Sequence, residues 1–229
     1  IESTPTAGVL SLSTAELQLV SNATVLEIGR LDGTGNVEVN RFFNDADVHA
    51  ATLRLLAGND VNHGVLSGIG AGAGTFDLEV RANNDVNLTN SNINLGNNHN
   101  LKVYADDDGS GVGSVNIGAV TVQVGSGPGN TTGFMDIKGA GVSIGVSGNA
   151  GGLVEVQGIG NQSITSTVGN VSLTNANTTG GKLLVRTAGG TQTVTASGTL
   201  LATGGTGNGG SKSVTLDSGG AQTISASTI

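Results

Sequence analysis

Short runs in which apolar and polar residues alternate recur along the chain. The clearest repeat unit holds three of them, at Thr191–Ser197, Thr199–Thr203 and Ser213–Ser218. An alternation of period two is typical of a β-strand with one buried face, and the Gly, Asn and Ser residues between the runs favour turns. In the third run, Val214 and Leu216 should therefore point inward, while Thr215 and Asp217 point outward.

These runs belong to two families of internal repeats. The segment LRLLAGNDVN from Leu53 returns as LEVRANNDVN from Leu78, and LKVYADD follows from Leu101 at a slightly shorter spacing. The C-terminal third repeats at a constant spacing, and each unit carries a glutamine followed by Ser or Thr and then Ile or Val: Gln162, Gln192 and Gln222. Three strands per period of this length predict a parallel β-helix, in which each period forms one triangular coil.

We therefore expect an all-β protein built as one solenoid over residues 1–229. At about 26 residues per coil the chain would form about nine coils of three short strands. Residues 1–50 are expected to form less regular first coils, residues 51–150 coils of roughly 23 to 30 residues, and residues 151–229 coils of roughly 30 residues that carry the glutamines. A short helix at Ser13–Leu19, with Ser13 or Thr14 as its N-cap and Glu16 in its first turn, is an alternative for part of the first coils.

The composition indicates a thin, aliphatic core. The chain has 40 Gly among 229 residues but only 4 Phe, 1 Tyr and no Trp. A triangular coil receives two or three inward side chains per strand and leaves room for few rings, and Gly supplies the positive φ angles that its corners require.

The aligned glutamines predict a ladder inside the solenoid. If Val194 points inward, Gln192 does so too, and the same alternation turns Gln162 and Gln222 inward. A buried amide must be hydrogen-bonded, and stacking one amide on the next, one coil away, achieves this. Asn59 and Asn84 are predicted to form a similar ladder at a corner. We interpret all five residues as structural positions that set the register of the coils.

Charge and residue usage exclude several classes of partner. Nine basic and 17 acidic residues give a net charge of -8 without a basic stripe, which argues against nucleic-acid binding. No run approaches the roughly 18 to 20 apolar residues of a membrane-spanning helix. The absence of Cys excludes thiolate metal sites and disulfides.

Candidate chemistry is sparse. The three histidines, His49, His63 and His99, are spaced unlike the coil periods, so they should not form a row of metal ligands. The run Asp106–Asp108, followed by Gly-Ser-Gly, is either a solvated turn at a corner or part of a calcium loop. No serine is accompanied by the matched acid and base that a catalytic nucleophile requires. We therefore expect no catalytic residue, no metal site and no cofactor.

Three sequence segments of the chain resemble the filamentous haemagglutinin family, the large bacterial adhesins that are secreted by the two-partner pathway. They are the segment Leu12–Val39, LRLLAGNDVN at Leu53, and the GGxQTxxAS units at Gly189 and Gly219. The resemblance implies a right-handed parallel β-helix, an extracellular or cell-surface location, and a stalk role in adhesion, biofilm or a surface fibre. The chain is much shorter than such proteins and shows no clear secretion-domain signature, so it is expected to be a segment of the shaft.

The function expected is therefore a non-enzymatic, rigid shaft module of a bacterial surface adhesin or filament. Its expected partners are further coils of the same or a longer chain, through end-to-end or lateral self-association, with host or surface glycans as a further class. Two alternatives stay open: a polysaccharide-active β-helix enzyme with a lateral groove of carboxylates, a basic residue and rings, and a carbohydrate-binding module assisted by calcium at Asp106–Asp108.

Overall fold

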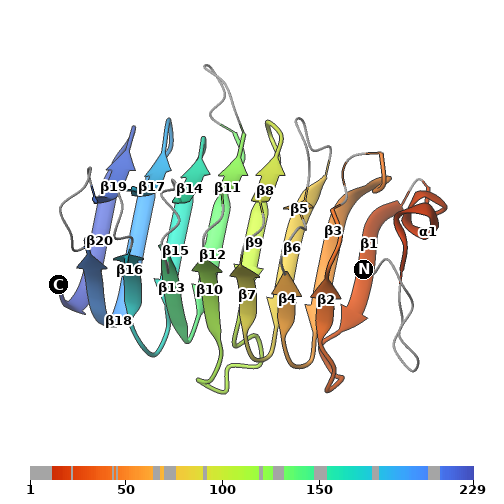
Figure 1. Ribbon diagram of the computed structural model, residues 1–229, viewed down its shortest axis with the longest axis horizontal. Helices are drawn as coiled ribbons and strands as arrows, with labels where there is room; N and C mark the ends of the chain where they lie inside the picture. Colours follow the sequence, from red (N-terminus) through yellow and green to blue (C-terminus); the bar gives the residue numbers. More distant parts are fainter. Residues whose placement is uncertain are drawn as a thin grey trace.

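Each strand pairs in parallel with the strand one coil further along the chain, and the result is a β-solenoid (Figure 1). This computed structural model describes residues 12–21, 23–42, 44, 46–63, 68–69, 76–89, 92–118, 121–125, 132–146, 154–176, 181–205 and 212–229. The predicted all-β parallel solenoid is confirmed.

The strands form three faces that run along the solenoid. Face A contains β1 (Ala23–Arg30), β3 (Ala50–Ala57), β6 (Asp77–Ala82), β9 (Leu101–Tyr104), β12 (Met135–Gly139), β15 (Gln162–Ser166), the first half of β18 (Gln192–Thr203) and β20 (Gln222–Thr228). Face B contains β2 (Val37–Val39), β4 (Val61–His63), β7 (Val86–Thr89), β10 (Ser114–Gly118), β13 (Gly141–Val146), β16 (Val171–Asn175) and the second half of β18. Face C contains β5 (Gly68–Ile69), β8 (Asn92–Leu95), β11 (Thr121–Val124), β14 (Val154–Gly158), β17 (Leu183–Thr187) and β19 (Val214–Ser218).

The stack contains about six turns, somewhat fewer than the about nine coils predicted. In the part of the chain that the structure describes, face C holds six strands. One contribution to the difference is that Leu101 of β9 pairs with Met135 of β12, which makes that coil longer than the repeats predicted.

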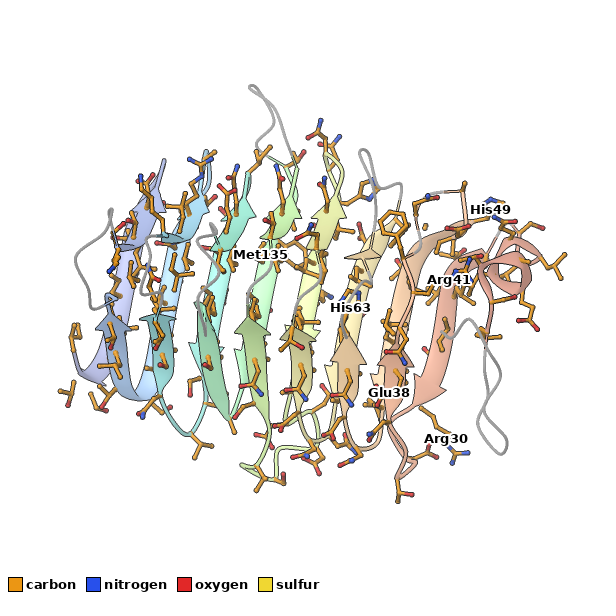
Figure 2. The ribbon with its side chains drawn as sticks, in the orientation of Figure 1. Arg30, Glu38, Arg41, His49, His63 and Met135 are labelled. Carbon is orange, nitrogen blue, oxygen red and sulfur yellow. The ribbon has the colours of Figure 1, made fainter. Side chains whose placement is uncertain are left out.

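The core consists of columns of aliphatic side chains stacked at equivalent positions of successive coils. On face A one inward column contains Leu53, Leu78 and Leu101 and continues with Met135, which lies in the middle of the stack (Figure 2). These four side chains are at most 1% exposed. One ring, that of Phe76, is also fully buried. The predicted alternation thus places a largely apolar interior behind an outward polar surface.

The helix α1 (Thr14–Gln18) lies beside β1 at the N-terminal end of the stack (Figure 1). Its N-cap Ser13 accepts a hydrogen bond from the backbone N–H of Glu16, whose carboxylate in turn accepts one from the backbone of Ser13. Of the two possibilities for this segment, the helix with Ser13 as its N-cap is the one observed. Leu17 is buried in the core, and Gln18 Nε2 donates to Asp47 Oδ1 at 2.8 Å, so α1 is held against the first coils. None of the helices among the described residues has the length and apolar character needed to cross a membrane.

Candidate functional site

The three glutamines predicted to stack do lie in one inward column. Gln192 Nε2 donates to Gln162 Oε1 at 2.7 Å, and Gln222 Nε2 donates to Gln192 Oε1 at 2.5 Å. Gln162 and Gln192 are 2% and 0% exposed, while Gln222 is exposed at the outer edge of β20. The column continues the one occupied by Leu101 and Met135, so amides replace apolar side chains partway along the core.

A second ladder runs along the corner that precedes face B. Asn84 Nδ2 lies 3.5 Å from Asn59 Oδ1, and Asn59 Nδ2 donates to Asn36 Oδ1 at 2.8 Å. Asp60 takes part as well, because its carboxylate accepts a hydrogen bond from Asn84 Nδ2 at 2.8 Å and one from the backbone N–H of Asp85 at 3.1 Å. The corner therefore contains both amides and carboxylates that join successive coils.

An outward ladder on face B was not anticipated from the sequence. Asn116 Nδ2 donates to Asn87 Oδ1, Asn87 Nδ2 to Asn62 Oδ1, and Asn62 Nδ2 to Glu38 Oε1, at 2.9, 2.9 and 2.7 Å. The signal was present in the repeated NDVN motif, whose last residue is Asn62 in one copy and Asn87 in the next.

Charged and aromatic side chains gather on the outer surface of face A. We call this surface the grid and define it by three outward positions on each of three neighbouring coils: Asp77, Glu79 and Arg81; Asn100, Lys102 and Tyr104; Phe134, Asp136 and Lys138. Glu79, Lys102 and Asp136 lie opposite one another in register and form its central column. Arg54 of β3 extends this column toward the N-terminus.

Glu79 is the most buried carboxylate of the grid and is held by two guanidinium groups. Arg54 Nε donates to its Oε2 at 3.0 Å and Arg81 Nε to its Oε1 at 2.5 Å. Burial opposes the ionised form, but the hydrogen bonds and charges of Arg81 and Arg54 outweigh burial and hold the pKa of Glu79 below its usual value. Arg81 also donates to Asp107 at 3.0 Å. These contacts cross-link three successive coils.

Tyr104 occupies the next coil, between Arg81 and Lys138. Its hydroxyl donates to Asp136 Oδ2 at 2.7 Å, and the Arg81 guanidinium lies 4.9 Å from the centre of its ring. Burial and the hydrogen bond to Asp136 raise the pKa of Tyr104 well above its usual value, so the phenol stays protonated and acts as a donor.

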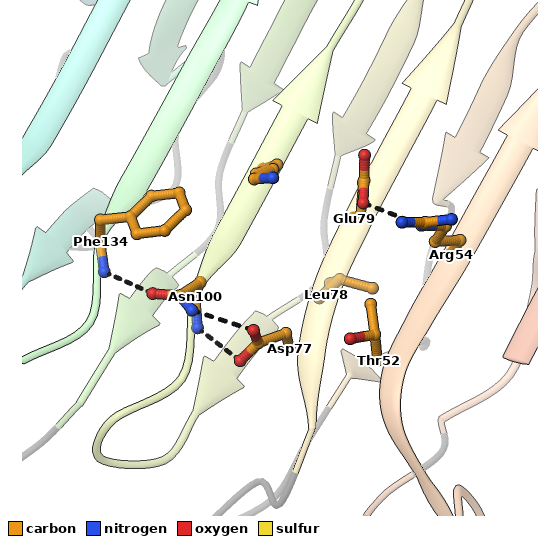
Figure 3. Close-up of a pocket in the computed structure, with 8 residues that line it drawn as sticks. Thr52, Arg54, Asp77, Leu78, Glu79, Asn100 and Phe134 are labelled. Atoms are coloured by element: carbon orange, nitrogen blue, oxygen red, sulfur yellow. Dashed lines mark hydrogen bonds and ion pairs between the residues drawn. The ribbon is translucent and has the colours of Figure 1, made fainter. Parts of the chain in front are cut away.

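The remaining edge of the grid is shown in Figure 3. Asn100 Nδ2 donates to Asp77 Oδ2 at 2.9 Å, and the backbone N–H of Phe134 donates to Asn100 Oδ1 at 3.0 Å. The ring of Phe134 is 36% exposed and lies 5.7 Å from Lys102 Nζ. Within the described part of the chain, no ion pair involves Lys102 or Lys138.

Two depressions flank the central column of the grid. One has a volume of about 200 Å³ and is lined by Arg54, Asp77, Lys102 and Phe134, among others. The other measures about 250 Å³ and is lined by Arg81, Tyr104, Ala105, Asp106, Asp107, Asp136 and Lys138. Residues of the central column line both hollows, which offer carboxylate, ammonium and aromatic groups.

Beyond β12 the same outward columns change to hydroxyl groups. The central column continues as Ser163, Thr193 and Thr223, and the column of Tyr104 continues as Thr165, Thr195 and Ser225. Face A is therefore divided into a charged half and a neutral, hydroxylated half.

Neither the acidic run nor the histidines form a metal site among the described residues. Asp106 Oδ1 instead accepts hydrogen bonds from Ser110 Oγ and the backbone N–H of Gly111, which closes the turn on itself. His49 is exposed, His63 lies in the core, and His99 Nδ1 is 3.2 Å from Asp77 Oδ1.

We compared the chain with family models, with curated proteins and with solved structures, and found no match. The site must therefore be interpreted from its own chemistry. The grid offers donors and acceptors of hydrogen bonds beside two rings, on a surface that is otherwise poor in charge.

Proposed function

We propose that this chain is a non-enzymatic shaft module of an extracellular or cell-surface bacterial adhesin or fibre, of the filamentous haemagglutinin type. The supporting observation is that side-chain ladders connect coil after coil: Gln162 to Gln222 inside, Asn62 to Asn116 outside, and Arg54 to Asp107 on face A. In a solenoid the strand-to-strand hydrogen bonds run along the long axis, and such ladders reinforce them in the same direction. A rod with these links suits the task of holding a binding element away from a surface.

The same proposal assigns the partners. Further coils of the same or a longer chain would continue the stack, and shafts would associate end to end or side by side.

Immunogold electron microscopy tests the location and the role. An antibody raised against the recombinant chain should label surface fibres of intact cells that make the protein. Labelling confined to the interior of sectioned cells would contradict the proposal.

A separate assay tests the non-enzymatic part. The recombinant chain is incubated with polygalacturonate and other acidic polysaccharides, and new reducing ends are measured. We expect none above a heat-denatured control, whereas turnover that is lost on Asp136→Asn substitution would favour the polysaccharide-active enzyme.

A further inference from the structure

We propose that the grid on face A binds a neutral polysaccharide chain, with the two hollows beside the central column receiving neighbouring sugar units. This inference goes beyond the shaft function, because a shaft needs no ligand on its side. It follows from three properties of the grid: its exposed rings, the polar groups that have no ion-pair partner within it, and the balance of its positive and negative charges.

The rings provide the apolar part of such a site. One face of a sugar ring carries C–H groups, and these pack well against an aromatic ring. Phe134 is 36% exposed although its neighbour Met135 is buried, and its ring borders the first hollow. Tyr104 borders the second hollow, where Arg81 and the hydrogen bond to Asp136 fix its orientation. Two of the five aromatic residues of the chain therefore lie on one small surface.

The polar groups that remain available are mainly donors, Lys102 in the central column and Lys138 in the column beside it. Glu79 is occupied by Arg54 and Arg81, and Asp77 by Asn100. Lys102 and Lys138, by contrast, form no ion pair with any described residue; Lys102 Nζ contacts only one face of the Phe134 ring, 5.7 Å from its centre. Each borders one of the hollows, so each hollow presents an ammonium group beside a ring.

The charge balance selects a neutral ligand. The nine positions of the grid hold three carboxylates (Asp77, Glu79 and Asp136) and three cations (Arg81, Lys102 and Lys138). Their fields largely cancel at a distance, and the whole chain carries a net charge of -8, which repels a polyanion. A sugar hydroxyl can donate to a carboxylate and accept from an ammonium at the same time, so a hydroxylated neutral chain uses both signs of charge.

Affinity electrophoresis tests this inference. The folded chain is run through gels that contain galactomannan, xyloglucan or dextran as neutral probes and polygalacturonate as the acidic one. We expect retardation by at least one neutral polysaccharide and none by polygalacturonate. Failure of all three neutral probes to retard the wild-type chain, or stronger retardation by polygalacturonate, would overturn the proposal.

Matched variants show whether the grid is the site. Phe134→Ala and Lys102→Met should each weaken binding about tenfold, while Phe42→Ala and Lys182→Met, which remove an exposed ring and an exposed lysine elsewhere, should leave it within about twofold. Circular dichroism and thermal melting confirm that each variant folds. Equal losses in grid and control variants would place the binding elsewhere and refute the assignment. The shaft proposal is independent of this result, since its test concerns location and turnover.

Discussion

At the scale of single residues, Gln192 shows how the core tolerates a polar side chain. Its amide nitrogen donates to Gln162 Oε1 and to the backbone carbonyl of Val185, and its oxygen accepts from Gln222. Replacing it in Gln192→Leu leaves buried acceptors without a donor, and we expect the free energy of unfolding to fall by about 1 to 3 kcal/mol. Urea denaturation measures this loss. Gln222→Leu is the matched comparison: Gln222 is exposed and its replacement removes only the donor to Gln192 Oε1, so it should cost less.

The double variant Gln162→Leu/Gln192→Leu tests whether the two amides act together. If the ladder is the stabilising unit, the loss in the double variant is smaller than the sum of the two single losses, since both partners become apolar. Losses that simply add would show that the stacked amides are not coupled.

His63 makes stability depend on pH. It lies on β4 in register with Val39 and Leu88, and burial lowers its pKa to about 4 from 6.5. Between these values the unfolded chain binds the proton and the folded chain does not, so stability is complete above the unfolded pKa and is lost as pH falls toward the folded pKa. We expect the free energy of unfolding to fall by about 2 kcal/mol between about pH 7.5 and pH 5 through this residue.

The comparison with His63→Leu isolates this effect from that of other groups. Urea denaturation of both proteins across the same pH range should give a flatter dependence for the variant. Parallel curves would mean that His63 titrates alike in the folded and unfolded chains.

At the scale of elements, the corners rely on glycines in the left-handed region. Gly113 has a φ of +132°, and a Cβ there would lie 2.5 Å from the backbone oxygen of Asn84. Gly109 has a φ of +68° with nothing within 4 Å. Both Ala variants are strained, but Gly113→Ala must also push the neighbouring coil away, so it should lose at least about 1 kcal/mol more than Gly109→Ala in urea denaturation. Equal losses would show that the corner has room to move.

The sequence predicted those elements whose signals are local or strictly periodic. The capping box at Ser13 needs only one turn of chain, and the glutamine column follows from a constant repeat length. The grid could not be predicted in this way, because Glu79, Lys102 and Asp136 follow one another at unequal spacings. Only the register of the strands shows that these residues are neighbours. Because the turns between strands differ in length, residues that stack in one column are not separated by a constant number of positions in the sequence.

At the scale of the whole molecule, each coil packs against its immediate neighbours, so stability should build up coil by coil. Deleting residues 162–191 removes one complete coil and brings Gln192 opposite Met135, the partner that Gln162 has now. We expect this variant to fold and to unfold cooperatively at a lower temperature, as measured by circular dichroism.

Deleting residues 162–176 is the control. It removes β15 and β16 but keeps β17, so β17 would follow β14 directly and would have to take the place of β15 on face A instead of its own on face C. This shorter deletion should prevent folding although it removes fewer residues. If the variant that lacks the complete coil 162–191 also failed to fold, the coils on either side of the deletion could not replace each other as partners, and the prediction would be wrong.

The division of face A between a charged half and a hydroxylated half has a consequence for how such a protein changes over time. Ser163 occupies the same column as Asp136, one coil further on, while Ile164 and Ile137 behind them are alike. Outward residues, which face solvent, and inward residues, which pack the coils together, alternate along the strands. Selection can therefore change the outward residues without changing the inward ones. A solenoid of this kind can therefore acquire, move or lose a recognition surface by substitution at outward positions alone, while its fold stays the same.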